Sequence, residues 1–371
     1  MKKKKILLIS NMYPSKNAKH YGSFVKNTEE LLKDNNYIVD KVIMTKHKNK
    51  IIKLFCYILF HLKVIIKGLF KNYDYLYVHF VSHSSLGAVI VKRLKKKTQL
   101  ILNCHGNDVM KDLDEEQMNV SRSHKYMKYA DKIVVPSQFC KKEVSLNYQI
   151  PSSKIFVYPS GGVDTDKFIK KDQKECRLKL GLDLNNKYIG FISRIEKHKG
   201  WDIFVEAINE LVETNKLKDY KFLIVGSGVE NEKLYSLIKE LKLGSVIEIK
   251  DMVYQDDLVD IYNSLDVFVL PSYRKESLGL VGLESMSCEV FTITSDQYGP
   301  TDYIVNNKNG FTFKLGDYKD LALKINKYFE LKDSDKEKIL KESRNTALKY
   351  DTKLTKNKIL EVFKWKQLLL F

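Results

Sequence analysis

The chain has 371 residues, of which 44% are hydrophobic and 30% are charged. This length favours two domains of ordinary size, each able to bury its own core. No stretch of 18 uncharged apolar residues is present and no signal-peptide pattern is visible, so we expect neither a spanning helix nor secretion. The five cysteines lack the CxxC spacing of a zinc site or a disulfide framework, which favours free thiols and a cytoplasmic location.

The net charge of +18 is concentrated in the first half of the chain. Residues 1–165 hold 29 Lys and Arg against 13 Asp and Glu, a net charge of +16, whereas residues 166–371 hold 35 against 33, a net charge of +2. A basic half is typical of proteins that face nucleic acid, an anionic membrane surface or a phosphate-bearing substrate, and also of surfaces whose lysines serve only solubility. No nucleic acid partner is expected, because aromatic residues are not interleaved with the basic ones.

Strands and helices alternate throughout the first half of the sequence. The periodicity predicts strands over residues 2–10, 37–45, 75–80, 100–104, 132–136 and 155–159. It predicts helices over residues 24–33, 51–70, 86–94 and 138–147. Residues 160–164 then break regular structure, and we place a domain boundary there.

A second alternation follows in the rest of the chain. The predicted strands cover residues 188–193, 221–225, 246–249, 266–272 and 290–294, and the predicted helices cover 201–213, 230–241 and 256–265. Residues 309–313 look hairpin-like, and residues 335–371 have a helical pattern. The fold class is therefore α/β, with two Rossmann-like parallel-sheet domains at 1–165 and 166–345 and a C-terminal helix at 346–371 that packs back on the first domain.

The predicted helix at residues 51–70 is apolar at most positions but carries Lys53, Lys63 and Lys67. A basic amphipathic helix of this kind can lie in a membrane interface. A helix that packs on a sheet and exposes its lysines to water has the same pattern. Both alternatives stay open on the sequence alone.

Two carboxylates eight positions apart, Glu276 and Glu284, enclose an apolar, glycine-spaced run. They follow the predicted strand 266–272 and so lie at a carboxyl end of the sheet, where open α/β sheets bind ligands and a helix N-terminus offers N–H groups to an anion. Paired carboxylates act as acid and base in glycoside hydrolases. Here one lies in a loop and the other in a helix, which favours contacts with different parts of one ligand, such as a ribose diol; two solvated glutamates are the alternative.

Two cations, Arg194 and Lys199, flank the N-terminus of the predicted helix 201–213. The planar guanidinium, the ammonium and the partial positive charge of the helix end together suit a diphosphate. The alternative is that both are surface cations paired with Glu196 or Asp202.

Three loops carry a histidine or glycines that a ligand could approach. His105 follows the predicted strand 100–104, where a neutral imidazole could donate to a sugar hydroxyl or bond only to a backbone carbonyl. Gly22 ends the loop after the first strand, which suits close approach of the backbone to a ligand or an ordinary turn. Gly226-Ser-Gly228 also follows a strand, but Asn231 replaces a third glycine, so its dinucleotide fingerprint is weak.

These motifs together resemble those of the retaining glycosyltransferases of family 4, which have the GT-B architecture of two Rossmann-like domains facing a central cleft. The resemblance covers nearly the entire chain. The features that carry it are Tyr13-Pro14 with Gly22-Ser-Phe-Val25, His105-Gly-Asn-Asp108, Ser193-Arg194 with Lys199-Gly200, and Glu276 with Glu284 followed by Gly299-Pro300 and Asn309-Gly310-Phe311.

The resemblance implies a nucleotide-diphosphate sugar as donor, with a UDP- or GDP-sugar favoured, no cofactor and no metal. The catalytic residues that it implies are His105, Arg194, Lys199 and Glu276. The donor-binding residues that it implies are Gly22, Ser277, Leu278, Gly279, Leu280 and Glu284. The two cations would neutralise the diphosphate, Glu284 would hold the ribose, Glu276 and His105 would contact the transferred sugar, and the other positions would contribute backbone contacts.

Retention in this family implies attack on the donor's own face, with the leaving phosphate taking the acceptor's proton. The expected acceptor is a saccharide or a polyprenyl-diphosphate-linked saccharide bound by the basic first domain, in the assembly of a capsule, a lipopolysaccharide O-antigen or an exopolysaccharide. Peripheral contact with the anionic inner face of the cell membrane would accompany it. A sugar-nucleotide epimerase on the same architecture and a non-catalytic nucleotide-sugar-binding scaffold are the alternative functions. Ser277-Leu278 depart from the usual glycine or serine and aromatic, and Asp302 from a common glutamate.

Overall fold

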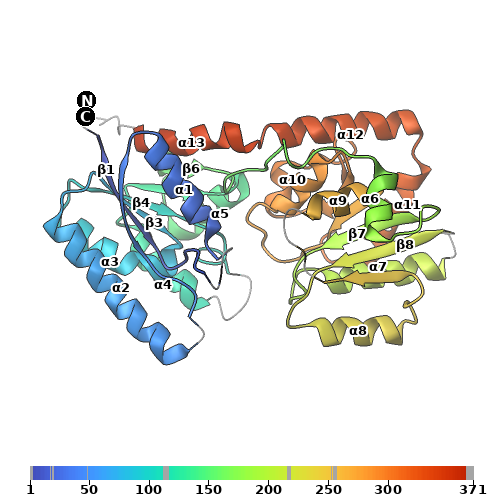
Figure 1. Ribbon diagram of the computed structural model, residues 1–371, viewed down its shortest axis with the longest axis horizontal. Helices are drawn as coiled ribbons and strands as arrows, with labels where there is room; N and C mark the ends of the chain where they lie inside the picture. Colours follow the sequence, from blue (N-terminus) through green and yellow to red (C-terminus); the bar gives the residue numbers. More distant parts are fainter. Residues whose placement is uncertain are drawn as a thin grey trace. The chain divides into compact units, whose positions relative to one another are not determined.

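The computed structural model describes residues 3–16, 18, 21–47, 49–111, 117–214, 219–251, 253 and 257–364. The chain divides into two compact units, Met1–Gly161 with Thr355–Phe371, and Gly162–Leu354. Each unit contains a six-stranded parallel sheet with helices against it (Figure 1). This confirms the predicted fold class of two Rossmann-like parallel-sheet domains.

The sheet of the first unit has the strand order β2-β1-β3-β4-β5-β6. Its strands are β1 (Lys5–Ser10), β2 (Ile38–Ile43), β3 (Tyr75–His79), β4 (Gln99–Asn103), β5 (Lys132–Val135) and β6 (Ile155–Val157). Its helices are α1 (Ser23–Asp34), α2 (Lys50–Phe70), α3 (Val81–Leu94), α4 (Gln117–Met127), α5 (Gln138–Tyr148) and the greater part of α13 (Thr352–Lys364), with a 3₁₀ turn at Ser152–Lys154.

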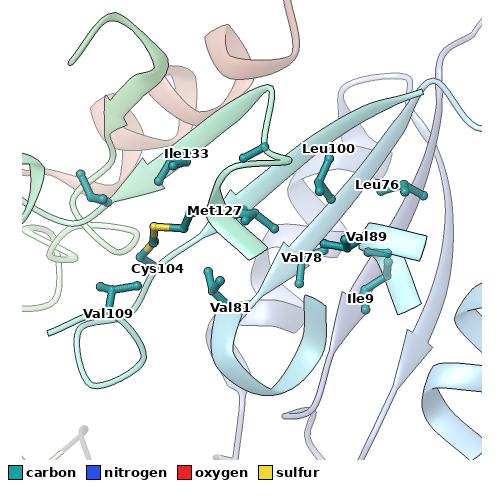
Figure 2. Packing of buried hydrophobic residues seen from close by; sticks show 14 of the residues in the cluster. Ile9, Leu76, Val78, Val81, Val89, Leu100, Cys104, Val109, Met127 and Ile133 are labelled. Carbon is teal, nitrogen blue, oxygen red and sulfur yellow. The ribbon is translucent and has the colours of Figure 1, made fainter. Parts of the chain in front are cut away.

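The core of this unit follows from the period of two along its strands. Leu7 and Ile9 belong to an apolar cluster with residues of α2, α3, α4 and α5, part of which Figure 2 shows. Ile6 and Leu8 belong to a second cluster with α1 and α13. Because successive strand residues point to opposite faces, a strand that is apolar at every position requires helices on both faces.

The sheet of the second unit has the strand order β12-β11-β10-β7-β8-β9. Its strands are β7 (Lys187–Ile192), β8 (Tyr220–Val225), β9 (Ile247–Lys250), β10 (Val267–Leu270), β11 (Phe291–Ser295) and β12 (Phe311–Phe313). Its helices are α6 (Gln173–Leu180), α7 (Trp201–Glu213), α8 (Asn231–Glu240), α9 (Leu258–Ser264), α10 (Leu280–Ser287), α11 (Tyr318–Glu330) and α12 (Asp333–Leu348), with a 3₁₀ turn at Gly299–Asp302. Ile189 and Phe191 pack with α7, α8 and α11, whereas Tyr188 and Ile192 pack with α9 and α10.

Each sheet has a point at which the direction of strand addition reverses. In the first unit β1 lies between β2 and β3, and in the second unit β7 lies between β8 and β10. The loops that leave two such neighbouring strands run to opposite faces of the sheet, which opens a crevice at the carboxyl ends of the strands where ligands bind. The loops after β7 and β10 carry Arg194, Lys199 and Glu276, and Glu284 lies in the helix that follows, α10.

Three sequence-based expectations differ from the structure. Residues 309–313 do not form a hairpin, because β12 pairs in parallel with β11 and buries Phe311 and Phe313 on one face. The helices α4, α6 and α11 were not predicted. The first two each bury only two residues and are mostly polar in sequence, whereas α11 buries Leu321, Ala322, Ile325 and Tyr328 and its pattern was overlooked. The helical pattern expected over residues 335–371 is interrupted, because Asp351, between α12 and α13, pairs with Val163; residues 365–371 lie outside the described part.

Candidate active site

The first loop of the site connects β7 to α7 and covers residues 193–200. It ends at Gly200, whose φ of 84° lies in the left-handed region. A Cβ atom at Gly200 would lie 2.2 Å from the carbonyl oxygen of Pro271, so only glycine lets this loop approach the second loop, 271–279, so closely. The two loops that carry the predicted site residues are therefore held together by their backbones.

An ion pair joins the same two loops. Lys199 Nζ donates to Glu276 Oε1 at 2.6 Å, and Ser272 Oγ donates to the same oxygen at 3.2 Å. The Lys199 and Glu276 side chains are only 14% and 19% exposed. The structure thus brings together two residues that the sequence separates by 77 positions.

The second loop is fixed at Glu276 and at its last residue, Gly279. The N–H of Gly299 donates to the carbonyl oxygen of Glu276 at 2.9 Å. Gly279, with a φ of 80°, begins α10, and the Tyr303 hydroxyl donates to its carbonyl oxygen at 2.8 Å. The first N–H groups of α10 have no intrahelical acceptor, so this end of the helix can receive an anion.

Glu284 has a different environment from Glu276. It lies in the second turn of α10, is 8% exposed, and accepts a hydrogen bond from the Tyr262 hydroxyl at 3.1 Å. Burial raises the pKa of Tyr262 well above its usual value, which keeps this hydroxyl a donor. The two carboxylates therefore have separate partners, as contacts with two parts of one ligand require.

Arg194 is the exposed member of the predicted set. Its side chain is 55% exposed, and Nη1 donates to Glu196 Oε1 at 2.7 Å. The alternative partner, Asp202, accepts instead from the Tyr273 hydroxyl at 2.8 Å. Exposed ion pairs of this kind contribute about 0–1 kcal/mol, so a diphosphate can compete with Glu196 for the guanidinium at little cost.

Two glycines that the sequence indicated only weakly support the Arg194 loop. A Cβ atom at Gly226 would lie 1.8 Å from the carbonyl oxygen of Ser193, and one at Gly228 would lie 2.2 Å from that of Ile195. The Ile195 N–H also donates to the Ser227 carbonyl oxygen at 3.2 Å. These glycines therefore serve close packing of two loops rather than a dinucleotide fingerprint.

In the first unit His105 lies beside a second histidine. His105 Nε2 lies 3.2 Å from Nδ1 of His79, the last residue of β3, and the Phe24 ring centroid lies 4.6 Å from that of His105. Burial lowers the pKa of His105 to about 4 and that of His79 well below its usual value. Both imidazoles are thus neutral at pH 7, and one facing nitrogen donates its hydrogen to the other.

Asp108 fixes the loop that carries His105, and sequence reasoning assigned it no role. Its carboxylate is fully buried and accepts the N–H of His105 at 2.9 Å and the N–H of Val81, the first residue of α3, at 2.8 Å. Burial raises its pKa to about 6, although these backbone N–H groups oppose the shift. A bond from a side chain to the backbone three residues earlier is one of the local patterns of Asp, so the position of Asp108 three residues after His105 is the signal that could have identified it.

Two predicted donor-binding positions have structural roles of their own. A Cβ atom at Gly22 would lie 2.6 Å from the carbonyl carbon of Met12, so the loop's own packing requires this glycine. The Leu278 side chain is 2% exposed and lies in the core. Ligand contacts through the backbones of Gly22, Ser277, Leu278, Gly279 and Leu280 stay predictions.

Comparisons with known proteins give the family. The family model of the glycosyl transferases group 1 matches residues 172–346, and that of glycosyltransferase family 4 matches residues 23–167. The capsular polysaccharide biosynthesis glycosyltransferase CapM of Staphylococcus aureus is 30% identical over 202 residues, which are 53% of this chain and 52% of that protein. The chain spans between about a third and a half of the length of the curated relatives it matches.

Solved structures share the fold over almost the full chain. A glycosyltransferase from Rickettsia africae matches with a TM-score of 0.75 at 22% identity, covering 98% of both chains. HepE of Anabaena, solved in complex with UDP and glucose, matches with a TM-score of 0.74 at 17% identity, covering 98% of this chain and 100% of that one. The two family models, which match most of both units, confirm the resemblance read from the motifs: the chain belongs to the family 4 glycosyltransferases, the glycosyl transferases group 1.

Proposed function

We propose that the protein is a retaining glycosyltransferase that moves a sugar from a nucleotide-diphosphate sugar to a saccharide or a polyprenyl-diphosphate-linked acceptor. The observation that carries the proposal is the Lys199–Glu276 pair. It joins the loops that follow the neighbouring parallel strands β7 and β10, at the point where the direction of strand addition reverses, and it lies close in sequence to the N-terminus of α10. A cation and a helix end suit a diphosphate, and a carboxylate suits sugar hydroxyls.

Each predicted residue has one role in this reaction. Arg194 and Lys199 neutralise the charge that develops on the diphosphate, and Glu284 holds the ribose. Glu276 orients the transferred sugar, and the neutral His105 donates a hydrogen bond to it. The bond from the sugar's anomeric carbon to the diphosphate oxygen breaks, a bond to the acceptor oxygen forms on the same face, and the acceptor's proton passes to the leaving diphosphate.

For the donor, we propose a UDP- or GDP-sugar. HepE of Anabaena, which shares the fold, was solved with UDP and glucose, and this supports UDP as the first nucleotide to test. Fixed cations provide the electrostatic stabilisation that a metal ion provides in other transferases, so the mechanism that we propose needs no metal.

For the acceptor, we propose a lipid-linked or free saccharide in the assembly of a surface polysaccharide. The relative CapM takes part in capsular polysaccharide biosynthesis, and the net charge of +16 on residues 1–165 suits a diphosphate-linked acceptor and an anionic membrane surface. The enzyme would then work in the cytoplasm, in peripheral contact with the membrane's inner face.

Thermal unfolding with UDP-, GDP- and ADP-sugars tests the donor first. A ligand at 100 times its dissociation constant stabilises the protein by about 2.7 kcal/mol, so the correct nucleotide should raise the melting temperature when the others do not. Product analysis then separates the alternatives. Release of free nucleotide diphosphate with transfer to an acceptor supports the proposal, an epimerised nucleotide sugar identifies an epimerase, and binding of a donor without turnover identifies a scaffold.

A further inference from the structure

The outer face of α2 exposes a continuous set of large apolar side chains. We call this set the α2 stripe. Each member is between 47% and 86% exposed, and the members are Ile51, Ile52, Leu54, Phe55, Ile58, Leu59, Leu62, Ile66 and Phe70. A soluble surface rarely carries so many large apolar residues side by side, so the stripe indicates a contact that they make.

Close packing against α3 fixes the direction in which the stripe faces. Within α2 only Phe60, Val64 and Gly68 are buried. A Cβ atom at Gly68 would lie 2.6 Å from Val91 of α3, and one at Gly87 of α3 would lie 2.9 Å from the backbone of α2. Each helix therefore contributes a glycine that lets the other approach closely. The α2 helix cannot turn its stripe inward without breaking this contact.

The stripe lies opposite the buried face of the helix. At about 100° per residue, all its members except Leu54 lie within about 60° of the direction opposite to Val64. The exposed Lys63 borders it on one side, Lys67 lies farther round the helix and donates to the carbonyl oxygen of Lys41 at 3.2 Å, and α2 contains no Asp or Glu. As one of the two alternatives predicted, the helix packs on its unit and exposes Lys53 and Lys63 to water. Most of its exposed side chains, however, are large and apolar.

We infer that α2 docks the protein on an anionic membrane surface, with the α2 stripe in the boundary between headgroups and acyl chains and the lysines at the phosphates. An amphipathic helix buries its apolar face about 5–10 Å into that boundary, and each lysine near an anionic leaflet adds to binding. No helix in the described part of the chain is long and apolar enough to cross a membrane. The inference names a partner for the proposed function, but its test needs no nucleotide sugar.

A second copy of the chain fits this face poorly. In a two-fold dimer the same patch meets itself, which would place the lysines of one α2 against those of the other with no carboxylate from either helix. The net charge of +16 on residues 1–165 adds to this repulsion. An anionic leaflet supplies both the apolar layer and the opposite charge.

Flotation with vesicles tests the inference. The full chain should bind vesicles of phosphatidylcholine with 30% phosphatidylglycerol at low salt, and bind more weakly at about 0.5 M salt or to phosphatidylcholine alone, because salt screens the lysines. The variant Phe55→Ser/Leu62→Ser should lower the partition coefficient by about tenfold or more. Its matched control is Leu146→Ser, on α5 of the same unit, where the side chain is 65% exposed against 64% for Phe55; this control should bind as the wild type does.

A depth measurement makes the test specific for α2. Tryptophan fluorescence of Phe55→Trp should be quenched by vesicles with brominated acyl chains, and that of Leu146→Trp should not. Absence of wild-type binding to the anionic vesicles, or equal loss in the α5 control, would overturn the inference. A concentration-dependent dimer without lipid that Phe55→Ser/Leu62→Ser abolishes would also overturn it and identify the stripe as an interface between copies. The proposed function is tested separately, by measuring donor binding through thermal unfolding.

Discussion

Lys199 and Glu276 form an ion pair with each other at 2.6 Å, although the family motif suggests that they contact different parts of a donor. The pair spans the loops that follow two hydrogen-bonded strands, β7 and β10. It holds both charges in place before a donor arrives, so little reorganisation is needed when the diphosphate binds. In the proposed mechanism, the donor's phosphate would share the Lys199 ammonium with Glu276.

Lys199→Ala should therefore impair both charge stabilisation and the placement of Glu276. We expect kcat/KM for the donor to fall by ~10²–10³, as for loss of one transition-state contact. In the double variant Lys199→Ala/Glu276→Ala, kcat/KM should fall by a smaller factor than the product of the two factors measured for the single variants, because the residues act as a unit. Steady-state kinetics with a saturating acceptor measures all three variants.

Lys197→Ala is the matched control for this set. Lys197 lies in the same loop two positions earlier and is exposed, so its removal lowers the loop's charge equally without touching the pair. A loss of activity in Lys197→Ala as large as in Lys199→Ala would show that only overall charge matters.

The support beneath Arg194 gives a second prediction. In Gly228→Ala the new Cβ atom would meet the carbonyl oxygen of Ile195 at 2.2 Å, so the loop must move. Overpacking of this kind costs roughly 1–3 kcal/mol, and displacement of Arg194 should weaken donor binding. Urea unfolding and nucleotide-dependent thermal shifts measure the two effects.

Gly244→Ala controls for the loss of a glycine in the same unit. No atom lies within 4 Å of a Cβ at Gly244, so this variant should unfold and bind the donor as the wild type does. If Gly228→Ala also behaves as the wild type, the packing of the two loops does not position Arg194.

Local patterns were enough to predict the fold. The apolar runs of β1 and β7, buried on both faces, and the amphipathic helices between them specify parallel sheets covered on both sides. The pattern failed where burial is slight or where a strand is defined by its pairing, and α11, which buries Leu321, Ala322, Ile325 and Tyr328, was overlooked despite its amphipathic sequence. The helix α4 buries only Ser123 and Met127, and β12 is three residues long and is defined by its pairing with β11.

The sequence predicted which types of residue form the candidate site but not which of them contact one another. The cations and carboxylates could be found because they flank strand ends and helix starts. Their pairing could not, since Lys199 and Glu276 are 77 residues apart and His79 and His105 are 26 apart. Only the strand order brings such positions together. The exposure of the α2 stripe is equally invisible in the sequence, because an apolar helix residue looks the same whether it faces a sheet or a membrane.

The fixed cations also predict the response to a chelator. Donor turnover should be unchanged in EDTA, because Arg194 and Lys199 provide the positive charge at the diphosphate. The assay is donor turnover in EDTA, with and without added Mg²⁺ or Mn²⁺. Loss of activity that either ion restores would contradict the metal-free mechanism.

Neutral His105 predicts how the stability of the first unit depends on pH. Its folded pKa, about 4 because of burial, is lower than the unfolded value of about 6.5. Between these values the unfolded chain binds a proton that the folded chain does not, so the free energy of unfolding falls as pH drops from 6.5 towards 4. Asp108, with its pKa raised to about 6, acts in the opposite direction, and the buried His79 acts in the same direction as His105.

The variant His105→Gln isolates the contribution of this imidazole, because a glutamine amide can still donate to His79. Between pH 6.5 and 5.5 the wild type should lose about 1 kcal/mol more unfolding free energy than the variant. Because the chain has two units, hydrogen exchange in β3 and β4 is the appropriate readout, since it reports the first unit alone. His124→Gln, at an exposed position of α4, is the control. An equal pH dependence in the wild type and His105→Gln would mean that burial does not lower the pKa of His105 in the folded protein, which would contradict the prediction.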